Sequence, residues 1–359
     1  MLIFCDNNIP YLDDALKQIG KIRHFNADRL TNEELIASKA DALFVRSTIK
    51  VNQDLLNNTN IRFVATATSG NDHFDIPYLE KSGIFYADAL GSNANSVAEY
   101  VVYAISRWAV ENKIDLSTKT IGIIGYGNIG KLVAKYSQYL GLNILVNDPP
   151  LKDYGYDFPD FFQYSELNDL IAKSDIITNH VPRILDGKYK TIDLINEQNL
   201  ELVKPNSLFI HASRGKVVQE SALIEIKCQK NMTLITDVWA DEPLINKELM
   251  KHSLLATPHI AGHSFEGKVR GTLMVVEAFE KFYNLKANKS YIYRLLDNYK
   301  PVNREIFDEK ASILTSLKQN RQLVEDDKFL RELSTHDDNT IKKGFINYRQ
   351  KYPVRKETL

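Results

Sequence analysis

The sequence contains very little cysteine, and this scarcity excludes two kinds of protein. Cys5 and Cys228 are the only cysteines among 359 residues, and they lie far apart in the chain. Two thiols cannot build the disulfide framework of a small secreted protein or a four-cysteine zinc site. The histidines show no metal-ligand spacing either. We therefore expect a protein without a metal centre that works in a reducing, cytoplasmic environment.

A long hydrophobic run and an excess of one charge are also missing. No apolar run approaches the roughly 20 residues that cross a bilayer, and the N-terminal MLIFCDNNIPYLDD lacks the basic start of a signal peptide. Lys and Arg number 45 and Asp and Glu 46, a net charge of -1. This balance argues against broad neutralisation of nucleic-acid phosphates. We predict a soluble protein whose partners include neither a membrane nor a nucleic acid.

Short apolar runs and amphipathic stretches alternate in the first 90 residues. At 359 residues, 44% of them hydrophobic, the chain is long enough for about two to three packed domains. The first apolar runs are typical of buried strands, at 2–6, 42–47, 62–69 and 84–89. Strands that alternate with helices predict a parallel sheet covered on both faces. A long apolar helix predicted over 94–113 leads out of this part.

A second alternating run follows and ends near residue 262. Helical patterns separate its apolar runs, which is the organisation of a doubly wound dinucleotide-binding domain. The six strand candidates are 120–125, 143–148, 175–181, 207–213, 234–240 and 253–259. From about residue 284 the chain becomes polar and charged but keeps apolar residues at helical spacing. We expect a small appended domain there.

A glycine-rich motif stands between the first strand and the first helix of this second run. Residues 125–130 read G-Y-G-N-I-G, which is a G-x-G-x-x-G pattern. Such a turn can be purely structural, but a strand before it and a helix after it favour a pyrophosphate site at the helix N-terminus. Gly125 would allow the tight turn, Gly127 the approach of the phosphates, and Gly130 close packing of the helix.

An acidic residue, Asp148, ends the next predicted strand, eighteen positions after Gly130. A carboxylate at this place accepts hydrogen bonds from ribose hydroxyls and repels the additional phosphate of NADP. The following residues, PPLKD, offer no arginine that would favour that phosphate. The alternative is a surface strand end without a ligand. With the glycine motif at this spacing, we predict NAD as the cofactor.

Three polar residues follow successive strands at the end of the second run. Arg214 and Glu242 come just after predicted strands, and His259 ends the last one, at the edge where open parallel sheets bind their ligands. Each could instead be a structural residue at a strand end. Together they suit a 2-hydroxy acid: a guanidinium binds the carboxylate, an imidazole takes the hydroxyl proton, and a carboxylate orients the imidazole and favours its charged form.

The order of these motifs carries a family resemblance. The succession GYGNIG, Asp148, SRGKVV, DVWADEP and TPHIAG resembles the D-isomer-specific 2-hydroxyacid dehydrogenases. The resemblance implies NAD-dependent oxidoreductase activity, with Arg214 and Glu242 as catalytic residues and His259 as the acid/base. Other segments, among them FVRSTIKVN, HIAGHSFEGKVRGT and the terminal NYRQKYPVRKE, resemble a branch of this family that acts on a phosphorylated 2-hydroxy acid and forms homodimers.

The resemblance also implies further binding residues, position by position. The cofactor would be held by the three motif glycines and Asp148 together with Asn128, Ile129, Val181, Ala212, Ser213, Asp237 and Gly262. The substrate would contact Ser47, Thr68 and His263, where His263 stands in place of a more usual tyrosine. The phosphate needs positive charge, and Arg46 and Lys50 are the cations nearest to Ser47 in sequence. Arg349 or Arg355, reaching across a dimer, is the weaker alternative.

The same resemblance implies a discontinuous architecture. We expect a flavodoxin-like substrate domain built from 1–93 with 263–284, a Rossmann NAD-binding domain over 94–262, and a C-terminal α+β dimerisation domain over 285–359. The fold class is therefore α/β with two doubly wound parallel sheets. Two other functions stay open: a sister dehydrogenase of the 3-phosphoglycerate or glyoxylate/hydroxypyruvate type, and an NAD-sensing binding protein on the same fold.

Overall fold

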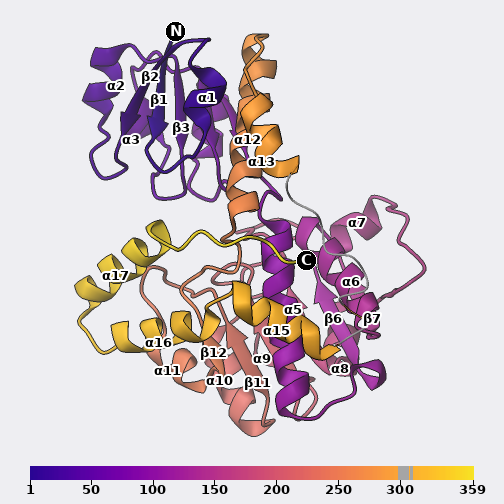
Figure 1. The fold of residues 1–359 in the computed structure, drawn as a ribbon. Helices are drawn as coiled ribbons and strands as arrows, with labels where there is room; N and C mark the ends of the chain where they lie inside the picture. The colour runs from indigo at the N-terminus through magenta and orange to yellow at the C-terminus, as the bar shows by residue number, and fades with distance from the viewer. Residues whose placement is uncertain (298–306, 308–309) are drawn as a thin grey trace. The chain divides into compact units, whose positions relative to one another are not determined.

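The computed structural model describes residues 1–297, 307 and 310–359 (Figure 1). The contacts between these residues divide the chain into two units. Unit 1 contains 1–93 and 264–297, and unit 2 contains 94–263 with the described residues from 307 onward. Each unit is built around one parallel β-sheet. The chain therefore leaves unit 1 after residue 93 and returns to it at residue 264.

Unit 1 contains a five-stranded parallel sheet with the order β2-β1-β3-β4-β5. This is the flavodoxin-like order, so the predicted class of the first sheet is confirmed. Its strands are β1 (Leu2–Asp6), β2 (Lys21–Phe25), β3 (Ala42–Val45), β4 (Phe63–Thr66) and β5 (Phe85–Asp88). Its helices are α1 (Leu12–Leu16), α2 (Asn32–Ser38), α3 (Gln53–Leu56), α4 (Ile76–Lys81), α12 (Phe265–Tyr283) and α13 (Ser290–Asp297).

Both faces of this sheet are buried, which explains its continuous apolar runs. In β1, Ile3 and Cys5 point to one face, and Phe4 points to the other. Helix α12 covers the Ile3 face with Val276 and Phe279. The helix starts after Ser264, whose hydroxyl oxygen accepts a hydrogen bond from the Gly267 amide at 3.0 Å. A segment 170 residues or more from the first strands thus completes their core.

The strand predictions omitted β2, and its sequence shows why. KIRHF at 21–25 is largely exposed and has three basic side chains, so it lacks the apolar signal of the other strands. It pairs with β1 only and forms the edge of the sheet. Charged side chains on an edge strand discourage further strand pairing. Its pairing with β1, rather than its own hydrophobicity, makes this segment a strand.

Unit 2 contains a seven-stranded parallel sheet with the order β12-β11-β10-β9-β6-β7-β8. From β8 to β12 this is the doubly wound 3-2-1-4-5-6 order with one additional strand, so the Rossmann prediction is confirmed. The strands are β6 (Thr120–Ile124), β7 (Asn143–Asn147), β8 (Gln163–Tyr164), β9 (Ile176–Asn179), β10 (Leu208–His211), β11 (Thr233–Thr236) and β12 (Leu255–Ala256). The short β8 was not among the predicted strands.

Helices of unit 2 lie on both faces of this sheet. They are α5 (Ala94–Glu111), α6 (Asn128–Tyr139), α7 (Pro149–Asp153), α8 (Leu167–Lys173), α9 (Glu197–Leu200), α10 (Glu220–Gln229) and α11 (Lys247–His252), with a 3₁₀ turn at Leu116–Thr118. The predicted helix over 94–113 is α5. It is buried along most of its length because it packs between the sheet core and α15 (Lys310–Asn320) (Figure 1).

The described C-terminal residues are helical and pack on unit 2. They form α15, α16 (Leu323–Leu333) and α17 (Asp338–Gln350), and the described part of this segment contains no strand. The α+β content that we expected is therefore not found there. The reason is the pattern: apolar residues such as Leu323, Leu330 and Phe345 face the core at helical spacing and do not alternate. The predicted role in dimerisation stays a prediction.

The end of the chain is anchored on α5 by a buried charge cluster. The Glu99 carboxylate pairs with Arg321 at 3.3 Å and with Arg355 at 3.2 Å, and all three side chains are at most 7% exposed. It also accepts the amide of Leu359 at 2.7 Å. Burial and the neighbouring Arg355 lower the pKa of Arg321 to about 10. Two guanidiniums against one buried carboxylate tie the last residues firmly to unit 2.

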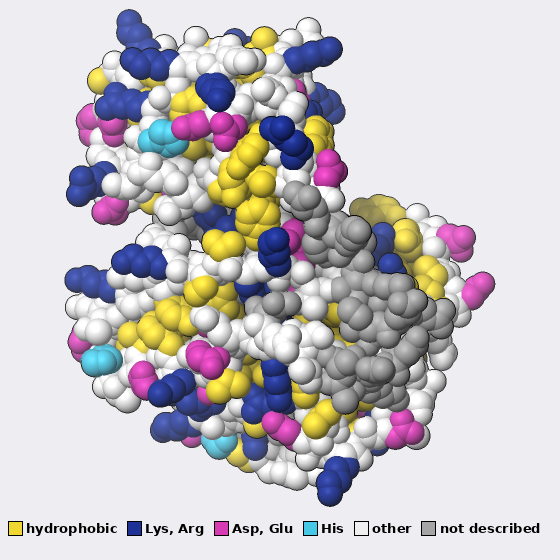
Figure 2. All heavy atoms as spheres, viewed as in Figure 1, with side chains coloured by type: hydrophobic (Ala, Val, Ile, Leu, Met, Phe, Trp, Pro, Cys, Tyr) yellow, Lys and Arg dark blue, Asp and Glu magenta, His cyan; other side chains and the backbone are white. Residues whose placement is uncertain are grey.

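The surface carries both signs of charge without a large area of one sign on the face shown in Figure 2. Lys and Arg side chains alternate there with Asp and Glu, in keeping with the net charge of -1. Many of the ion pairs join residues three or four positions apart, such as Lys173 with Asp169 at 3.4 Å. Exposed pairs of this kind add little to stability. None of the helices of the described residues is long and apolar enough to cross a membrane.

Candidate active site

The predicted cofactor and catalytic residues of unit 2 all follow strands of its sheet. The glycine motif follows β6, Asp148 follows β7, Val181 follows β9 and Arg214 follows β10. Because all seven strands are parallel, their carboxyl ends lie at one edge of the sheet. Ligands of open α/β sheets bind at this edge. The fold therefore brings together residues that are up to 137 positions apart, from Gly125 to Gly262.

The first turn of the glycine motif has the geometry that the sequence predicted. Gly125 has φ of 92°, a left-handed conformation that favours glycine. Gly130 lies so close to the strand that a Cβ atom there would be 2.0 Å from the Gly125 carbonyl oxygen. A side chain at position 130 would thus push α6 away from β6. Both residues fix the start of α6 against the end of the strand.

Gly127 has a different environment, which fits a ligand. It precedes α6 as its N-cap, and it is exposed. A Cβ atom at this position would meet nothing within 4 Å, and φ is -77°. Neither packing nor backbone conformation within the chain therefore calls for glycine here. With no side chain to cap the helix, the first amide groups of α6 remain available for an anion such as a pyrophosphate.

Asp148 joins the glycine motif to the end of β7. Its carboxylate accepts the Tyr126 amide at 2.7 Å and the Leu151 amide at 3.0 Å. Each carboxylate oxygen can accept a further hydrogen bond, and the residue is half-buried. The side chain is thus held beside the motif with acceptor capacity left. This is the arrangement that an acidic residue needs to bind ribose hydroxyls.

The remaining cofactor candidates of unit 2 line the same strand ends with differing exposure. Asn128 is exposed, Ile129, Val181 and Gly262 are half-buried, and Ala212 and Ser213 are buried. The Ser213 hydroxyl is a buried polar group without a hydrogen-bond partner within the described structure. A buried hydroxyl group without a partner, at the same edge of the sheet as the glycine motif, is consistent with a bound ligand that supplies the missing hydrogen bond. The residues present therefore fit a bound dinucleotide.

Glu242 and His259 form a hydrogen-bonded pair, as the chemistry of the predicted site required. The His259 Nδ1 atom lies 2.7 Å from Glu242 Oε2, and the side chains are 26% and 22% exposed. Because the carboxylate accepts from Nδ1, the neutral imidazole has its lone pair on Nε2. Nε2 is therefore the atom that can receive a proton. Glu242 and His259 are 17 positions apart in the sequence, and the whole of α11 lies between them.

The second oxygen of Glu242 is also occupied. Oε1 accepts the Trp239 amide at 2.9 Å. Burial acts to raise the pKa of Glu242, but the charge and hydrogen bond of His259, the Arg349 guanidinium and the Trp239 amide together lower it below its usual value. The carboxylate therefore stays ionised at neutral pH. An ionised Glu242 stabilises a positive charge on His259.

The loop that carries His259 is held by the buried carboxylate of Asp237. This carboxylate accepts the Ile260 amide at 2.8 Å, the Ala261 amide at 2.9 Å and the Thr257 hydroxyl at 2.6 Å. His259 itself has φ of 55°, a left-handed conformation that few non-glycine residues adopt. Burial raises the pKa of Asp237, and the charge of His259 and these hydrogen bonds oppose the increase. Asp237 is thus placed to position His259.

Arg214 lies next to this pair of loops. Its Nη1 donates to the Ser213 carbonyl at 3.0 Å, and the residue is half-buried. The following Gly215 packs so tightly that a Cβ atom there would be 2.0 Å from the Trp239 carbonyl oxygen. The turn after β10 therefore touches the loop that leads to Glu242. The three predicted catalytic residues are brought together within unit 2.

The substrate candidates divide between the units. In unit 1, Arg46 and Ser47 follow β3, and Thr68 follows β4, at the carboxyl edge of that sheet. The hydroxyl groups of Thr68 and Thr66 are 2.7 Å apart, and Ser47 is exposed. In unit 2, the His263 ring centroid lies 5.3 Å from that of Tyr352. His263 is therefore beside the C-terminal segment.

Arg349 is a contact of the site that sequence reasoning placed elsewhere. We considered it as a phosphate ligand that reaches across a dimer. In the structure it extends from α17 of the same chain, and its Nε donates to the His259 carbonyl at 3.2 Å. It also lowers the pKa of Glu242. No motif marks this arginine, and only the packing of α17 on unit 2 brings it to His259.

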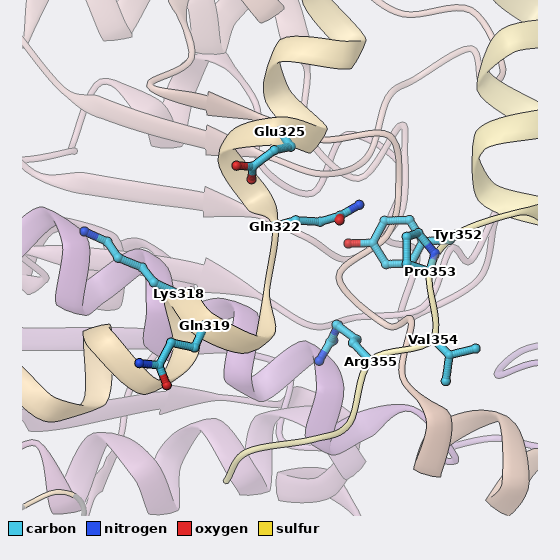
Figure 3. A pocket seen from close by; sticks show the side chains of 8 residues that line it. All are labelled: Lys318, Gln319, Gln322, Glu325, Tyr352, Pro353, Val354 and Arg355. Carbon is cyan, nitrogen blue, oxygen red and sulfur yellow. The ribbon is translucent and has the colours of Figure 1, made fainter.

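A cavity in unit 2 is lined by Arg355, one of the weaker phosphate candidates, and by none of the residues predicted to be catalytic or to bind the cofactor. It has a volume of about 440 Å³ and lies between α15, α16 and the segment after α17 (Figure 3). Its lining residues are Lys318, Gln319, Gln322, Glu325, Tyr352, Pro353, Val354 and Arg355. In Figure 3 the Arg355 side chain comes from the chain's last residues, which the Glu99 cluster anchors. Among the described residues, no group of three or more His, Cys, Asp or Glu side chains could hold a metal ion.

Comparison with known proteins places this site in a class. Residues 95–261 match the NAD binding domain of the D-isomer specific 2-hydroxyacid dehydrogenases. The crystal structure of NAD⁺-bound 3-phosphoglycerate dehydrogenase from Entamoeba histolytica superimposes with a TM-score of 0.66 at 22% identity, covering 79% of this chain and 95% of that one. D-lactate dehydrogenase from Aquifex aeolicus, complexed with NAD and lactic acid, gives 0.61 at 24%, covering 79% and 96%. Fold and site define an NAD-dependent dehydrogenase.

Full-length relatives define the branch. The erythronate-4-phosphate dehydrogenase of Wigglesworthia glossinidia brevipalpis is 37% identical over 99% of this chain and 92% of its own length. That of Proteus mirabilis is 39% identical over 99% and 93%. This chain belongs to the erythronate-4-phosphate dehydrogenase family. Its cofactor is NAD, as the matched NAD binding domain indicates.

Proposed function

We propose that this enzyme oxidises 4-phospho-D-erythronate to (R)-3-hydroxy-2-oxo-4-phosphobutanoate with NAD, in the synthesis of pyridoxal 5'-phosphate. The observation that supports it most strongly is the Glu242–His259 pair at 2.7 Å, at the same sheet edge as the glycine motif. We infer the substrate from the name of the full-length relatives, which are erythronate-4-phosphate dehydrogenases. The positions of the other candidate residues, at the carboxyl ends of the strands, support the same reaction.

The proposed roles of the catalytic residues follow from their chemistry. Arg214 binds the C1 carboxylate through two parallel hydrogen bonds and orients C2. His259 takes the C2 hydroxyl proton on Nε2, because Nδ1 is engaged by Glu242. Glu242 stabilises the imidazolium that results. When bound at the glycine motif, NAD would supply the acceptor for the hydride that leaves C2. Asp237 and Arg349 act through the loop, by holding the backbone just after His259: Asp237 accepts the Ile260 amide, and Arg349 donates to the His259 carbonyl.

The proposed cofactor site uses the residues described at the strand ends. The first amides of α6 hold the pyrophosphate, and Asp148 accepts the ribose hydroxyls. The full set is Gly125, Gly127, Asn128, Ile129, Gly130, Asp148, Val181, Ala212, Ser213, Asp237 and Gly262. Both Asp237 oxygens are engaged with its own loop, so any contribution of Asp237 to NAD is made in addition to these bonds. Ser47, Thr68, His263 and Arg46 are the proposed substrate contacts.

We further propose that the enzyme is a cytoplasmic homodimer that pairs through its C-terminal segment. Several apolar side chains of this segment are exposed in the single chain, among them Val324 at 57% and Val354 at 72%. Apolar surface on adjacent helices is typical of subunit contacts. We keep the proposed domain boundaries of 1–93 with 263–284, 94–262 and 285–359, although the C-terminal helices pack on unit 2.

A substrate comparison tests the proposed function. We expect NADH formation with 4-phospho-D-erythronate to exceed that with 3-phospho-D-glycerate and with D-glycerate in kcat/KM. The assay should contain a reagent that traps the carbonyl product, because the oxidation of a hydroxy acid by NAD is thermodynamically unfavourable. Preference for a glycerate would assign the enzyme to the 3-phosphoglycerate or glyoxylate/hydroxypyruvate type. Tight NAD binding without turnover of any 2-hydroxy acid would instead support an NAD-sensing protein.

The Glu242→Gln variant should change the pH dependence of the reaction. The oxidation needs a neutral imidazole, so kcat/KM falls on the acid side as His259 becomes protonated. Removing the ionised Glu242, whose pKa is lowered, removes the charge that favours the imidazolium. We therefore expect the acid limb of the kcat/KM profile to move to lower pH, together with a lower maximum.

The matched control for this variant is Glu248→Gln. Glu248 also pairs with a histidine, His252, at 3.1 Å, but this pair is on the surface. Its removal should leave the pH profile in place. If the acid limb of Glu242→Gln coincides with that of the parent enzyme, Glu242 does not set the protonation of His259 and its proposed role is wrong.

A further inference from the structure

Two loops and one helix converge at the carboxyl edge of the sheet in unit 1. The loop after β1 is held by α12, because the Thr272 hydroxyl donates to the Pro10 carbonyl at 2.9 Å. It is held equally by the residue that follows β3, because Arg46 Nη1 donates to the Asn8 carbonyl at 3.0 Å. Gly271 adds a third contact, since a Cβ atom there would be 2.7 Å from the Ala67 carbonyl. The first turns of α12 thus belong to the edge where Arg46 and Ser47 lie.

Lys268 lies on this same part of α12. It is four residues before Thr272, and residues four apart share one face of a helix. Phe265, one turn earlier, contacts the Tyr11 ring with centroids 6.3 Å apart. Lys268 therefore faces the loop of residues 8–11, which Arg46 also contacts. It is half-buried, and among the described residues its ammonium group makes no hydrogen bond or ion pair that would neutralise it.

Two positive charges lie near each other at this place. Burial and the positive charge of Arg46 both lower the pKa of Lys268, so the two cations are near enough to repel each other. A buried carboxylate, Asp6, ends β1 before this loop. Its Oδ1 accepts hydrogen bonds from the amide and the side chain of Asn8 at 2.8 and 3.0 Å, and its Oδ2 has no hydrogen-bond partner among the described residues. Cations held together in a half-buried place are stabilised when an anion binds.

We propose that Lys268 and Arg46 together bind the phosphate group of the substrate. The proposal rests on the proposed function, and it adds Lys268 of α12, to which the sequence analysis assigned no role. A phosphate carries about two negative charges at neutral pH, which matches two cations. The substrate carboxylate is assigned to Arg214, so the phosphate is the anionic group that remains. The N-terminal turns of α12 add the favourable field of the helix dipole.

The test compares a phosphorylated with an unphosphorylated substrate. In Lys268→Gln, kcat/KM for 4-phospho-D-erythronate should fall by about 10- to 100-fold, the range for one lost charge-assisted hydrogen bond. For D-erythronate, which has no phosphate, the fall should be much smaller. Lys268→Arg keeps the charge and should recover most of the activity. Lys281→Gln is the matched control, since it removes the same charge about 20 Å further along the same helix.

A second readout does not depend on turnover. Inorganic phosphate should inhibit the oxidation of D-erythronate competitively in the parent enzyme, and Lys268→Gln should raise its inhibition constant by a similar factor. Equal falls in kcat/KM for both substrates, with an unchanged inhibition constant, would overturn the role of Lys268 and leave the proposed function intact. If the parent enzyme itself does not prefer the phosphorylated substrate, the proposed function fails, and the two failures are thereby distinguished.

Discussion

The His259→Ala variant should lose about 10²–10⁴-fold in kcat, the usual contribution of a positioned acid/base group, and should still bind NAD. The geometry explains both parts. Nε2 of His259 is the proton acceptor, because Glu242 occupies Nδ1 at 2.7 Å. The glycine motif and Asp148 hold the cofactor through other strand ends. Steady-state kinetics gives the loss of kcat, and a fluorescence titration gives the affinity for NAD. Added imidazole should restore part of the activity.

Two further variants keep this result interpretable. Alanine at position 259 leaves the Glu242 carboxylate without its partner, so His259→Asn, which can still donate a hydrogen bond, separates a loss of stability from a loss of chemistry. His252→Ala removes a histidine that also pairs with a glutamate, at 3.1 Å on the surface, and should be fully active. Near-normal turnover in His259→Ala would show that another group accepts the proton.

The Arg214→Ala variant should be impaired to a comparable degree, but through binding of the carboxylate. Two charge-assisted hydrogen bonds contribute roughly 10²–10⁴-fold when both are lost. We expect most of this loss in kcat/KM. Lys at this position should recover little, because an ammonium group cannot form the two parallel bonds of a guanidinium. The affinity for NAD should stay within a few fold of that of the parent enzyme. Added guanidinium should restore activity to Arg214→Ala but not to Arg214→Lys.

The control for this experiment is Arg23→Ala. Arg23 is an exposed arginine of β2 that pairs with Glu34 at 2.7 Å, and its removal should affect neither kcat nor KM. If Arg214→Lys is as active as the parent enzyme, a point charge is sufficient and the bidentate contact is absent. If Arg214→Ala binds NAD much more weakly, the arginine supports the cofactor site instead of the substrate.

Much of the fold could be predicted from the pattern of apolar residues. Strands buried on both faces appear as continuous apolar runs, so β1 and β6 were found with bounds that the structure repeats or changes by one residue. The polar edge strand β2 and the two-residue β8 were missed. Their hydrogen bonds come from a neighbouring strand, and a strand of this kind carries no hydrophobic signal of its own.

The order of the site motifs along the chain indicated their chemistry for a similar reason. Parallel strands place their carboxyl ends at one edge, so polar residues that follow successive strands, such as Arg214 and His259, are expected to meet. The sequence pattern does not show which residues hold the catalytic loops in place. Asp237 holds the His259 loop through two backbone amides, and Arg349 reaches the same loop from a helix 90 residues further along.

The amino-acid sequence by itself determined the two parallel sheets, the NAD motif and the identities of the candidate catalytic residues, because these depend on local periodicity and on spacing within one strand–turn–helix unit. Only the tertiary structure decided where the long-range contacts fall. Lys268 joins Arg46 because α12 returns to a sheet begun more than 200 residues earlier. The chain end is buried because Glu99 binds two distant arginines. Such contacts arise from packing between segments, and no local pattern encodes them.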